Sequence, residues 1–222
     1  MTDRPFLDWA WIGDHAGEIG ELTVDHIVLT GLAVGIGLAI SFPLAILSHR
    51  VRWMYPPVTW IAGLLYTIPS LALFAFLVSF TGLTKLTAEI GLVSYTLLIL
   101  IRNIVVGLDG VPVDVNDAAR GMGYTAGQLL WRVQTPLALP AVVAGLRIAT
   151  VTTIGLVTVT AIITEGGLGQ LILQGFRRDQ PIQVVVGAGL SLILAVGADA
   201  ALLGIQRALT PWSRHRTVGK VG

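Results

Sequence analysis

The 222-residue chain contains no cysteine and few charged residues. The absence of cysteine excludes a disulfide-stapled scaffold and metal sites built from thiolates. Charged residues make up 12% of the sequence, about half of the ~25% that is typical of soluble domains. With 54% apolar residues and a mean hydropathy of +0.79, the composition excludes both a soluble enzyme and a disordered chain. The net charge of +1 provides no global field to attract nucleic acid, and no nucleic-acid partner is expected.

Long stretches without a charged residue or a histidine dominate the sequence. Four of them contain 22, 32, 17 and 19 residues, at 27–48, 53–84, 148–164 and 180–198. A hydrocarbon core of roughly 30 Å needs about 20 apolar residues in a helix. With turn and proline signals as boundaries, the sequence predicts an all-α, polytopic membrane protein. Its five transmembrane helices are expected at residues 26–48, 57–80, 89–107, 139–164 and 183–205.

Lysine and arginine are distributed unevenly between the two sets of connecting segments. Nine fall on one side: Arg50, Arg52, Arg102, Arg120, Arg132, Arg207, Arg214, Arg216 and Lys220. Four fall on the other: Arg4, Lys85, Arg177 and Arg178. The positive-inside rule therefore predicts an extracellular N-terminus and a cytoplasmic C-terminus. We expect an extracellular tail at 1–25, a transmembrane domain at 26–205 with a cytoplasmic loop at 108–138, and a basic cytoplasmic tail at 206–222.

The cytoplasmic loop 108–138 is predicted to contain two short helices. Asp114 is the expected N-cap of the first helix, with Asp117 three residues further on, and Gly121 and Gly123 are expected to end it. The segment 125–128 has the pattern of a capping box for a second helix, which we expect Pro136 to stop. A DNA-binding helix–turn–helix is disfavoured because membrane spans closely flank the loop and its basic residues are few.

The segment Asp117-Ala118-Ala119-Arg120-Gly121-Met122-Gly123, with Val133-Gln134-Thr135-Pro136 nine residues later, resembles the EAA signature of ABC importer permeases. Asp, Val and Thr replace Glu, Ile and Leu of that signature, and the spacing is intact. The resemblance implies a type I ABC importer permease fold, in which the first short helix is the coupling helix that docks in a cleft of the ATP-hydrolysing subunit. Two alanines let a partner approach the helix backbone, and a glycine permits a sharp turn. The expected coupling residues are Asp117, Ala118, Ala119, Arg120, Gly121, Gly123 and Pro136.

Other segments extend the resemblance over residues 25–205. Together with 119–123, three of them resemble the permeases of glycine betaine, choline and carnitine importers: Thr67-Ile68-Pro69-Ser70-Leu71-Ala72-Leu73, Ile101-Arg102-Asn103 and Gly166-Gly167-Leu168-Gly169. This resemblance implies a permease subunit for quaternary-amine osmoprotectants in the bacterial inner membrane. Permeases for methionine or a sulfonate are the nearest alternatives. The candidate gate or path residues are Pro69, Ser70, Arg102, Asn103, Gly166, Gly167 and Gly169.

The glycine-rich segment 166–169 follows the fourth predicted span and has two interpretations. It is placed to act as a flexible hinge of an outer gate or as a contact for a docked receptor. Equally, it is a tight turn that needs backbone freedom. A phosphate-binding loop is disfavoured because no Gly-Lys-Ser/Thr follows it.

Aromatic and ionisable residues inside the predicted spans are further candidates. A quaternary ammonium is recognised by aromatic faces and carboxylates. The candidate lining residues are Trp60, Tyr66, Phe74 and Tyr95, although aromatic residues in a span also pack or face lipid. Asp199 is expected to face the bundle and to pair with Arg147 or Arg102, because an unpaired charge within a membrane is costly.

The sequence contains no catalytic constellation, and its four histidines lack metal-ligand spacing. We therefore expect a non-catalytic subunit without a cofactor or metal of its own, with ATP and Mg on a partner. The resemblance implies a cytoplasmic ABC ATPase, an extracellular solute-binding protein, a second permease, identical or homologous, that completes a dimer, and the lipid bilayer. The alternative from another class is an ion-gradient-driven secondary carrier, which the lack of an internal repeat disfavours.

Overall fold

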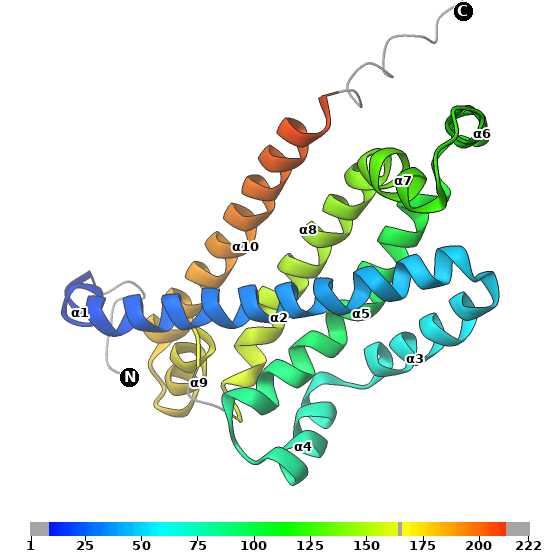
Figure 1. Cartoon of the computed structure of the whole chain (residues 1–222). Helices are drawn as coiled ribbons and strands as arrows, with labels where there is room; N and C mark the ends of the chain where they lie inside the picture. The colour runs from blue at the N-terminus through cyan, green and yellow to red at the C-terminus, as the bar shows by residue number, and fades with distance from the viewer. Residues whose placement is uncertain (1–8, 164–165, 212–222) are drawn as a thin grey trace, which may run out of the picture.

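The computed structural model describes residues 9–163 and 166–211, and this part of the chain is built from helices without a strand (Figure 1). Its elements are α1 (Trp9–Asp14), α2 (Ala16–Arg50), η1 (Arg52–Met54), α3 (Tyr55–Thr67), α4 (Ser70–Thr81), α5 (Lys85–Asp109), α6 (Val113–Gly121), α7 (Ala126–Leu129), η2 (Leu130–Gln134), α8 (Thr135–Thr160), α9 (Gly169–Arg177) and α10 (Pro181–Leu209).

Four helices within the described residues are long and apolar enough to cross a membrane: α2, α5, α10 and the continuous helix Ala126–Thr160, which comprises α7, η2 and α8. The bent pair of Arg52–Thr67 and Ser70–Thr81 adds a fifth span if its two halves are taken together. The predicted class, an all-α polytopic membrane protein, is confirmed.

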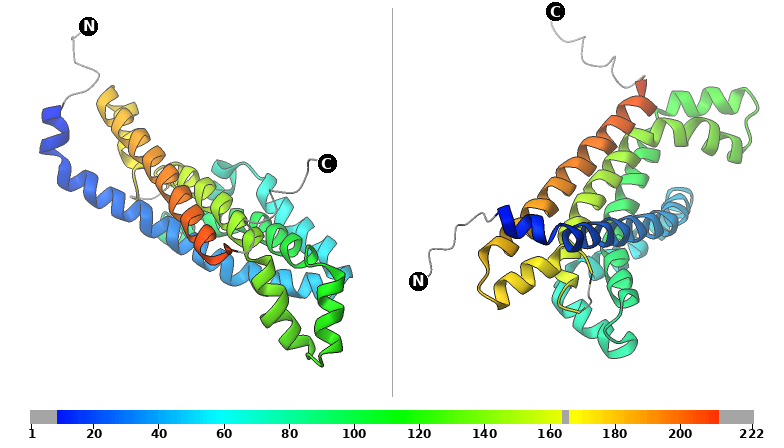
Figure 2. Two further views of the ribbon diagram at one scale, coloured as in Figure 1. Left: turned by 90° about the horizontal axis from the view of Figure 1, so that it is seen from above. Right: turned by 90° about the vertical axis from the view of Figure 1, so that its left-hand side faces the viewer.

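Helix α5 lies at the centre of the bundle, where it contacts α2, α3, α4 and α8 (Figure 2). Its residues Leu92, Leu100 and Ile104 are completely buried, and their spacing places them on one face of the helix. Glycine allows the close approach of α2, because a Cβ at Gly37 would lie 1.9 Å from the Oγ1 of Thr96. Helix α10 lies at the edge and packs mainly on α8 and α9.

The prediction of one continuous helix at 57–80 is wrong. Helix α3 ends at Thr67, α4 begins at Ser70, and the two halves of the pair are bent by 96°. Pro69 explains the break, because a proline lacks the N–H donor and disfavours helical backbone at the preceding residue. Ile68 accordingly has extended backbone angles, with φ −65° and ψ 129°. The apolar character continues across the break, so composition alone did not separate the two helices.

Pro136 does not stop the second helix of the loop, and this prediction is also wrong. The chain continues as one helix from Ala126 to Thr160. In the π-helical turn η2, the Thr135 N–H donates to the Leu130 carbonyl, five residues earlier. Pro136 then lies in the first turn of α8, directly after this wider turn, where its ring is tolerated. The fourth predicted span therefore begins inside the segment that was expected to be a loop.

Two further boundaries differ from the prediction. Helix α2 begins at Ala16, inside the predicted tail 1–25, and α9 occupies a segment where only a turn was expected. Several predicted features lie outside the described residues: Arg4 near the N-terminus, Thr164 at the end of the fourth span, and the tail residues Arg214, Arg216 and Lys220.

The bundle has two ends, which we call the α6 end, with α6 and α7, and the α9 end, with α4 and α9 (Figure 1). Arg50 belongs to the α6 end, since its guanidinium donates to the Ala126 carbonyl (3.4 Å). Lys85 and Arg177 belong to the α9 end, where both line one cavity of about 550 Å³. These three basic residues separate between the two ends as the sequence count predicted.

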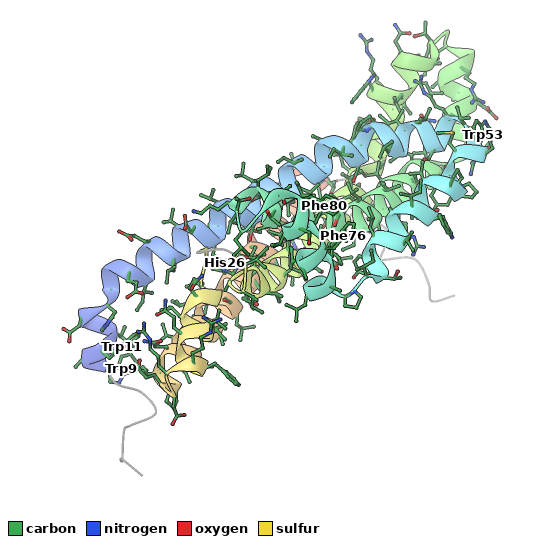
Figure 3. All side chains as sticks on the ribbon, turned by 90° about the horizontal axis from the view of Figure 1, so that it is seen from below. Trp9, Trp11, His26, Trp53, Phe76 and Phe80 are labelled. Atoms are coloured by element: carbon green, nitrogen blue, oxygen red, sulfur yellow. The ribbon has the colours of Figure 1, made fainter. Side chains whose placement is uncertain are left out.

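Exposed tryptophans lie near both ends of the bundle. Figure 3 shows Trp9 and Trp11 at the end where α2 begins and Trp53 at the end where it finishes. Trp9 and Trp53 are 74% and 73% exposed. Tryptophan is enriched at both membrane–water interfaces, so this arrangement fits a bundle that spans a bilayer.

Candidate functional site

Helix α6 projects beyond the membrane-spanning helices at its end of the bundle (Figures 1 and 2). Its surface is apolar at both ends, since Val113 and Met122, the residue that follows the helix, are each 70% exposed. Between them lie the exposed Asp117, Ala118 and Arg120, and Arg120 forms an ion pair with Asp117 (3.2 Å). The projecting helix therefore presents a mixed apolar and charged surface outside the bundle.

Ala119 has a different position from its neighbour Ala118. It is 2% exposed and faces the bundle, where α6 contacts α7 and η2. Of the two alanines, Ala118 is therefore open to a partner, and Ala119 lets α6 sit close to its own chain. The sequence pattern does not separate these two roles.

The ends of α6 are formed by backbone geometry. Asp114 was predicted as the N-cap, and this prediction is wrong. The N-cap is Pro112, Asp114 lies in the first turn, and no side chain caps the helix there. At the other end α6 stops at Gly121, and Gly123 has φ +83°, the left-handed conformation that favours glycine. The reversal of the chain between α6 and α7 therefore depends on Gly123.

One side-chain contact holds α6 relative to the long helix, and a capping box forms the start of that helix. The Gln134 amide donates to the Asn116 Oδ1 (3.1 Å), which joins η2 to α6. The predicted capping box of α7 is present, with the Gln128 N–H donating to the Thr125 hydroxyl and the Thr125 N–H donating to the Gln128 Oε1. Since α7, η2 and α8 form one helix, α6 is hydrogen-bonded directly to the start of a membrane span.

The glycine turn, Gly166–Gly169, lies at the α9 end and is buried. Gly167 has φ +71°, and a Cβ at Gly169 would lie 2.2 Å from the Thr158 carbonyl oxygen. Gly167 therefore requires glycine for its backbone conformation, and Gly169 requires it because no space remains for a side chain. This geometry matches the interpretation as a tight, packed turn.

His26 fixes this glycine turn from α2 (Figure 3). The completely buried imidazole accepts a hydrogen bond from the Leu168 N–H at Nδ1 (3.2 Å), and its Nε2 lies 3.1 Å from the Ile154 carbonyl. The neutral tautomer that carries its proton on Nε2 satisfies both partners. One side chain thus joins α2, α8 and the glycine turn. His26 is not recognisable from the sequence, because a single histidine carries no spacing signal.

The break at Pro69 is stabilised by Tyr95 of α5. Its hydroxyl donates to the Ile68 carbonyl at the break, and its ring packs edge-on against Tyr66 with centroids 6.0 Å apart. Ser70 opens α4 directly after Pro69. The structure therefore brings Pro69, Ser70, Tyr66 and Tyr95 into one region.

The remaining candidate aromatic residues divide by exposure. Phe74 is 1% exposed and packs on α5, because a Cβ at Gly91 would lie 2.3 Å from its ring. Trp60, by contrast, is 70% exposed on α3. In this conformation Phe74 and Tyr95 are packing residues, whereas Trp60 and Tyr66 offer an accessible aromatic face.

Arg102 and Asn103 are adjacent in α5 and point to different surroundings. Arg102 is exposed, and no described residue forms an ion pair with it. Asn103 donates to the Ile99 carbonyl (2.8 Å), and its Cβ lies 2.5 Å from where a Cβ of Gly145 would be. Asn103 therefore lies in the contact between α5 and α8.

Arg147 of α8 and Asp199 of α10 form a bidentate ion pair. The Nε–H and one Nη2–H of Arg147 donate to the two carboxylate oxygens of Asp199, each over 2.8 Å. Of the two partners proposed for Asp199, the structure selects Arg147. This parallel, two-bond geometry is the strong form of an arginine–carboxylate contact. Within the described residues, no three His, Asp or Glu side chains are grouped to hold a metal ion.

These features define the structural class of the protein. Several apolar helices long enough to cross a bilayer, with the short helix α6 projecting beyond one end, make a multi-pass membrane protein.

The chain belongs to the family of binding-protein-dependent transport system inner membrane components, whose model matches residues 31–214. The predicted family and the inner-membrane location are thereby confirmed. The family implies an ATPase and a solute-binding protein as partners.

Curated relatives match nearly the whole chain. The osmoprotectant import permease protein OsmW of Salmonella typhimurium is 38% identical over 203 residues, which cover 89% of this chain and 94% of OsmW. The choline transport system permease protein OpuBB of Bacillus subtilis is 33% identical over 202 residues, covering 91% and 93% of the two chains.

Solved structures share the fold. The chain is similar to a chain of the MetNI methionine ABC transporter in an inward-facing conformation, with a TM-score of 0.79 and 22% identity, over 92% of this chain and 100% of that one. A chain of an amino acid ABC transporter crystallised with histidines gives a TM-score of 0.76 at 16% identity, over 94% and 100%.

Proposed function

We propose that this chain is the permease subunit of an ATP-driven importer for quaternary-amine osmoprotectants such as glycine betaine, choline or carnitine. The proposed coupling to an ATPase is supported by the projecting helix α6, whose two ends are apolar and whose Ala118 is exposed. The solute class is supported by the relatives OsmW and OpuBB, which are named for osmoprotectants and choline.

In the proposed orientation the α6 end faces the cytoplasm and the α9 end faces outward. The described basic residues support it, since Arg50, Arg52, Arg120, Arg132 and Arg207 belong to the α6 end or to the ends of helices that meet there. This orientation presents α6 to a cytoplasmic ATPase and the glycine turn to the side from which a receptor delivers solute.

The proposed assembly is a dimer of permeases, identical or homologous, with two ATPase subunits and one extracellular receptor. The chain itself is non-catalytic, and ATP and Mg bind to the partner. ATP binding closes the ATPase pair, and the motion reaches the permease through Asp117, Ala118, Arg120 and the turn at Gly121 and Gly123. Pro69, Ser70 and the residues Gly166, Gly167 and Gly169 lie at bends of the chain where a gate can act.

A single substitution on α6 tests the coupling. Ala118→Trp places a large ring on the exposed face and should reduce copurification of the ATPase subunit at least about tenfold, since a clash at a docking interface is worth more than ~1.4 kcal/mol. Ala39→Trp is the matched control, because Ala39 is exposed on α2, outside the docking helix. Equal copurification of both variants would contradict a docking role of α6.

The solute class is tested with the cognate receptor and the wild-type transporter. ATP-dependent uptake into proteoliposomes should be observed for glycine betaine, choline or carnitine. Uptake of methionine in place of all three would refute the proposed substrate class and leave the permease role intact.

A further inference from the structure

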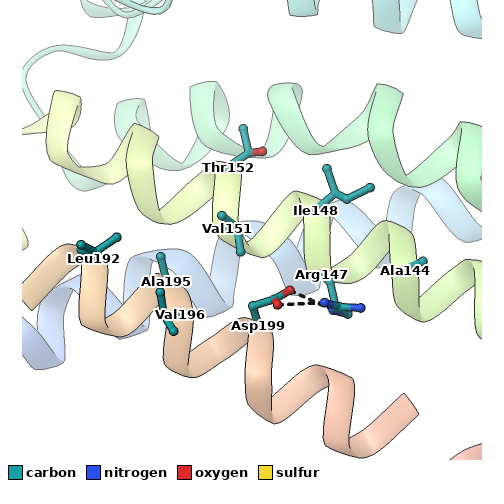
Figure 4. Close-up of a pocket in the computed structure, with 9 residues that line it drawn as sticks. All are labelled: Ala144, Arg147, Ile148, Val151, Thr152, Leu192, Ala195, Val196 and Asp199. Carbon is teal, nitrogen blue, oxygen red and sulfur yellow. Dashed lines mark hydrogen bonds and ion pairs between the residues drawn. The ribbon is translucent and has the colours of Figure 1, made fainter. Parts of the chain in front are cut away.

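A hollow of about 590 Å³ lies between α8 and α10 (Figure 4). Small side chains make room for it, and the Arg147–Asp199 ion pair provides its charged wall. Its lining residues are Ala144, Arg147, Ile148, Val151, Thr152, Leu192, Ala195, Val196 and Asp199. The volume falls in the range of ~300–1,000 Å³ that is usual for small-molecule sites, and such sites combine apolar walls with a few polar groups.

The charged wall lies at the depth of the membrane core. Asp199 precedes Arg207, near the end of α10, by eight residues, which corresponds to about 12 Å along a helix. It follows Pro181, at the other end, by 18 residues, or about 27 Å. Charged side chains at such depth face the bundle interior or a water-filled cavity. The hollow is therefore an open, mainly apolar groove at membrane depth, with the Arg147–Asp199 pair as its charged wall.

The ion pair is open toward the hollow. The side chains of Arg147 and Asp199 are 25% and 38% exposed although they bind each other. A guanidinium carries more N–H donors than the two that Asp199 accepts, and a carboxylate has further lone pairs. Each group holds its partner in place and retains capacity for a second contact on the exposed side.

We propose that this hollow binds the transported solute, with Arg147 contacting a carboxylate and Asp199 contacting a quaternary ammonium. A betaine carries both charges on one small molecule, and the adjacent guanidinium and carboxylate present the complementary charges side by side. The methyl groups of the ammonium then lie against the apolar wall formed by Val151, Ala195 and Val196. This inference rests on the proposed function and adds the residues that contact the solute.

The two charged residues make separable contributions to binding. Glycine betaine and carnitine have a carboxylate for Arg147, whereas choline has none and depends on Asp199 alone. Arg147→Gln should therefore weaken glycine betaine binding and preserve choline binding, because Asp199 then has no competing cation. Asp199→Asn should have the larger effect on choline, because the carboxylate of glycine betaine still contacts Arg147.

The test measures saturable binding of radiolabelled glycine betaine and choline to the receptor-free permease–ATPase complex. We expect Arg147→Gln to lower the ratio of betaine to choline affinity at least tenfold and Asp199→Asn to raise it. Asp25→Asn, which breaks the exposed Lys85–Asp25 pair (3.0 Å), is the matched control and should leave the ratio unchanged. If either single variant fails to assemble, Arg147→Gln/Asp199→Asn replaces it. That variant contains no unpaired charge and should bind neither solute.

The outcomes separate this inference from the proposed function. Wild-type uptake of glycine betaine with the receptor, together with equal loss of both solutes in each single variant, would overturn the solute site and leave the importer intact. No saturable binding to the wild-type complex would also overturn it, in favour of a hollow filled by lipid or by the second permease. Failure of wild-type uptake for every osmoprotectant would refute the function itself.

Discussion

Replacing His26 with alanine should destabilise the bundle more than the same change at the partly buried His15. The imidazole is completely buried and serves two backbone groups that are distant in sequence, the Leu168 N–H and the Ile154 carbonyl. Alanine offers neither an acceptor nor a donor. The Leu168 N–H would then be left without a partner in a buried region, and the Ile154 carbonyl would keep only its bond within α8.

The magnitude follows from these two lost contacts. A buried donor without a partner costs about 1–3 kcal/mol and the lost second bond to the Ile154 carbonyl about 1 kcal/mol, so the two together account for about 2–4 kcal/mol of unfolding free energy. His15→Ala is the matched control. The His15 ring stacks on Trp11 with centroids 4.3 Å apart and binds the carbonyl of the same residue, one turn away. That local contact is worth about 1 kcal/mol.

The assay is reversible unfolding of the purified permease in mixed micelles, followed by circular dichroism. His26→Gln should recover part of the loss, because its amide carries both a donor and an acceptor. Heteronuclear NMR of the histidine-labelled protein should show the neutral tautomer with the proton on Nε2. Equal losses of stability for His26→Ala and His15→Ala would refute the reasoning.

Two further substitutions test the bends of the chain in the same unfolding assay. Gly167→Ala should cost about 1–2 kcal/mol from the left-handed conformation alone, and more because the new Cβ would lie 3.0 Å from Val157. Gly155→Ala, inside α8 with open space around it, should instead stabilise the protein by about 0.5–1 kcal/mol. Tyr95→Phe should cost about 1 kcal/mol, because the Ile68 carbonyl at the break loses its donor. An unchanged stability in either variant would show that the contact is not maintained in the micelle.

The all-α membrane class was predictable because it depends on the hydrophobicity summed over many residues. Four uncharged runs identify four of the five predicted spans even where single boundaries fail. The break at Pro69 was not predictable from the summed hydrophobicity, since the residues on both sides are equally apolar. Proline also occurs inside α2 at Pro43 and inside α8 at Pro140, where the helix continues. The consequence of a proline therefore depends on tertiary contacts such as that of Tyr95, which sequence does not display.

The candidate site was predictable where a motif has fixed spacing and unpredictable where distant segments meet. The segment Asp117–Gly123 was located by its spacing, but only the structure shows that Ala119 faces inward and Ala118 outward. The pairing of Asp199 followed from the cost of an isolated charge, although the choice between Arg147 and Arg102 required the packing of α8 on α10. His26 has no local pattern, because its partners lie 128 and 142 residues away.

The continuity of α7, η2 and α8 links the two ends of the molecule. This single helix, Ala126–Thr160, is about 50 Å long at 1.5 Å per residue. At its start, Gln134 binds Asn116 of the docking helix; midway, Arg147 forms the charged wall of the hollow; and near its end, Ile154 binds His26 beside the glycine turn. If Pro136 had ended the helix, a displacement of α6 would be absorbed in a loop. Because the π-turn lets the helix continue, we expect a displacement of α6 to move α8 itself, which reaches both the hollow and the turn. Under the proposed function, α8 is therefore the element through which the ATPase acts on the transport path.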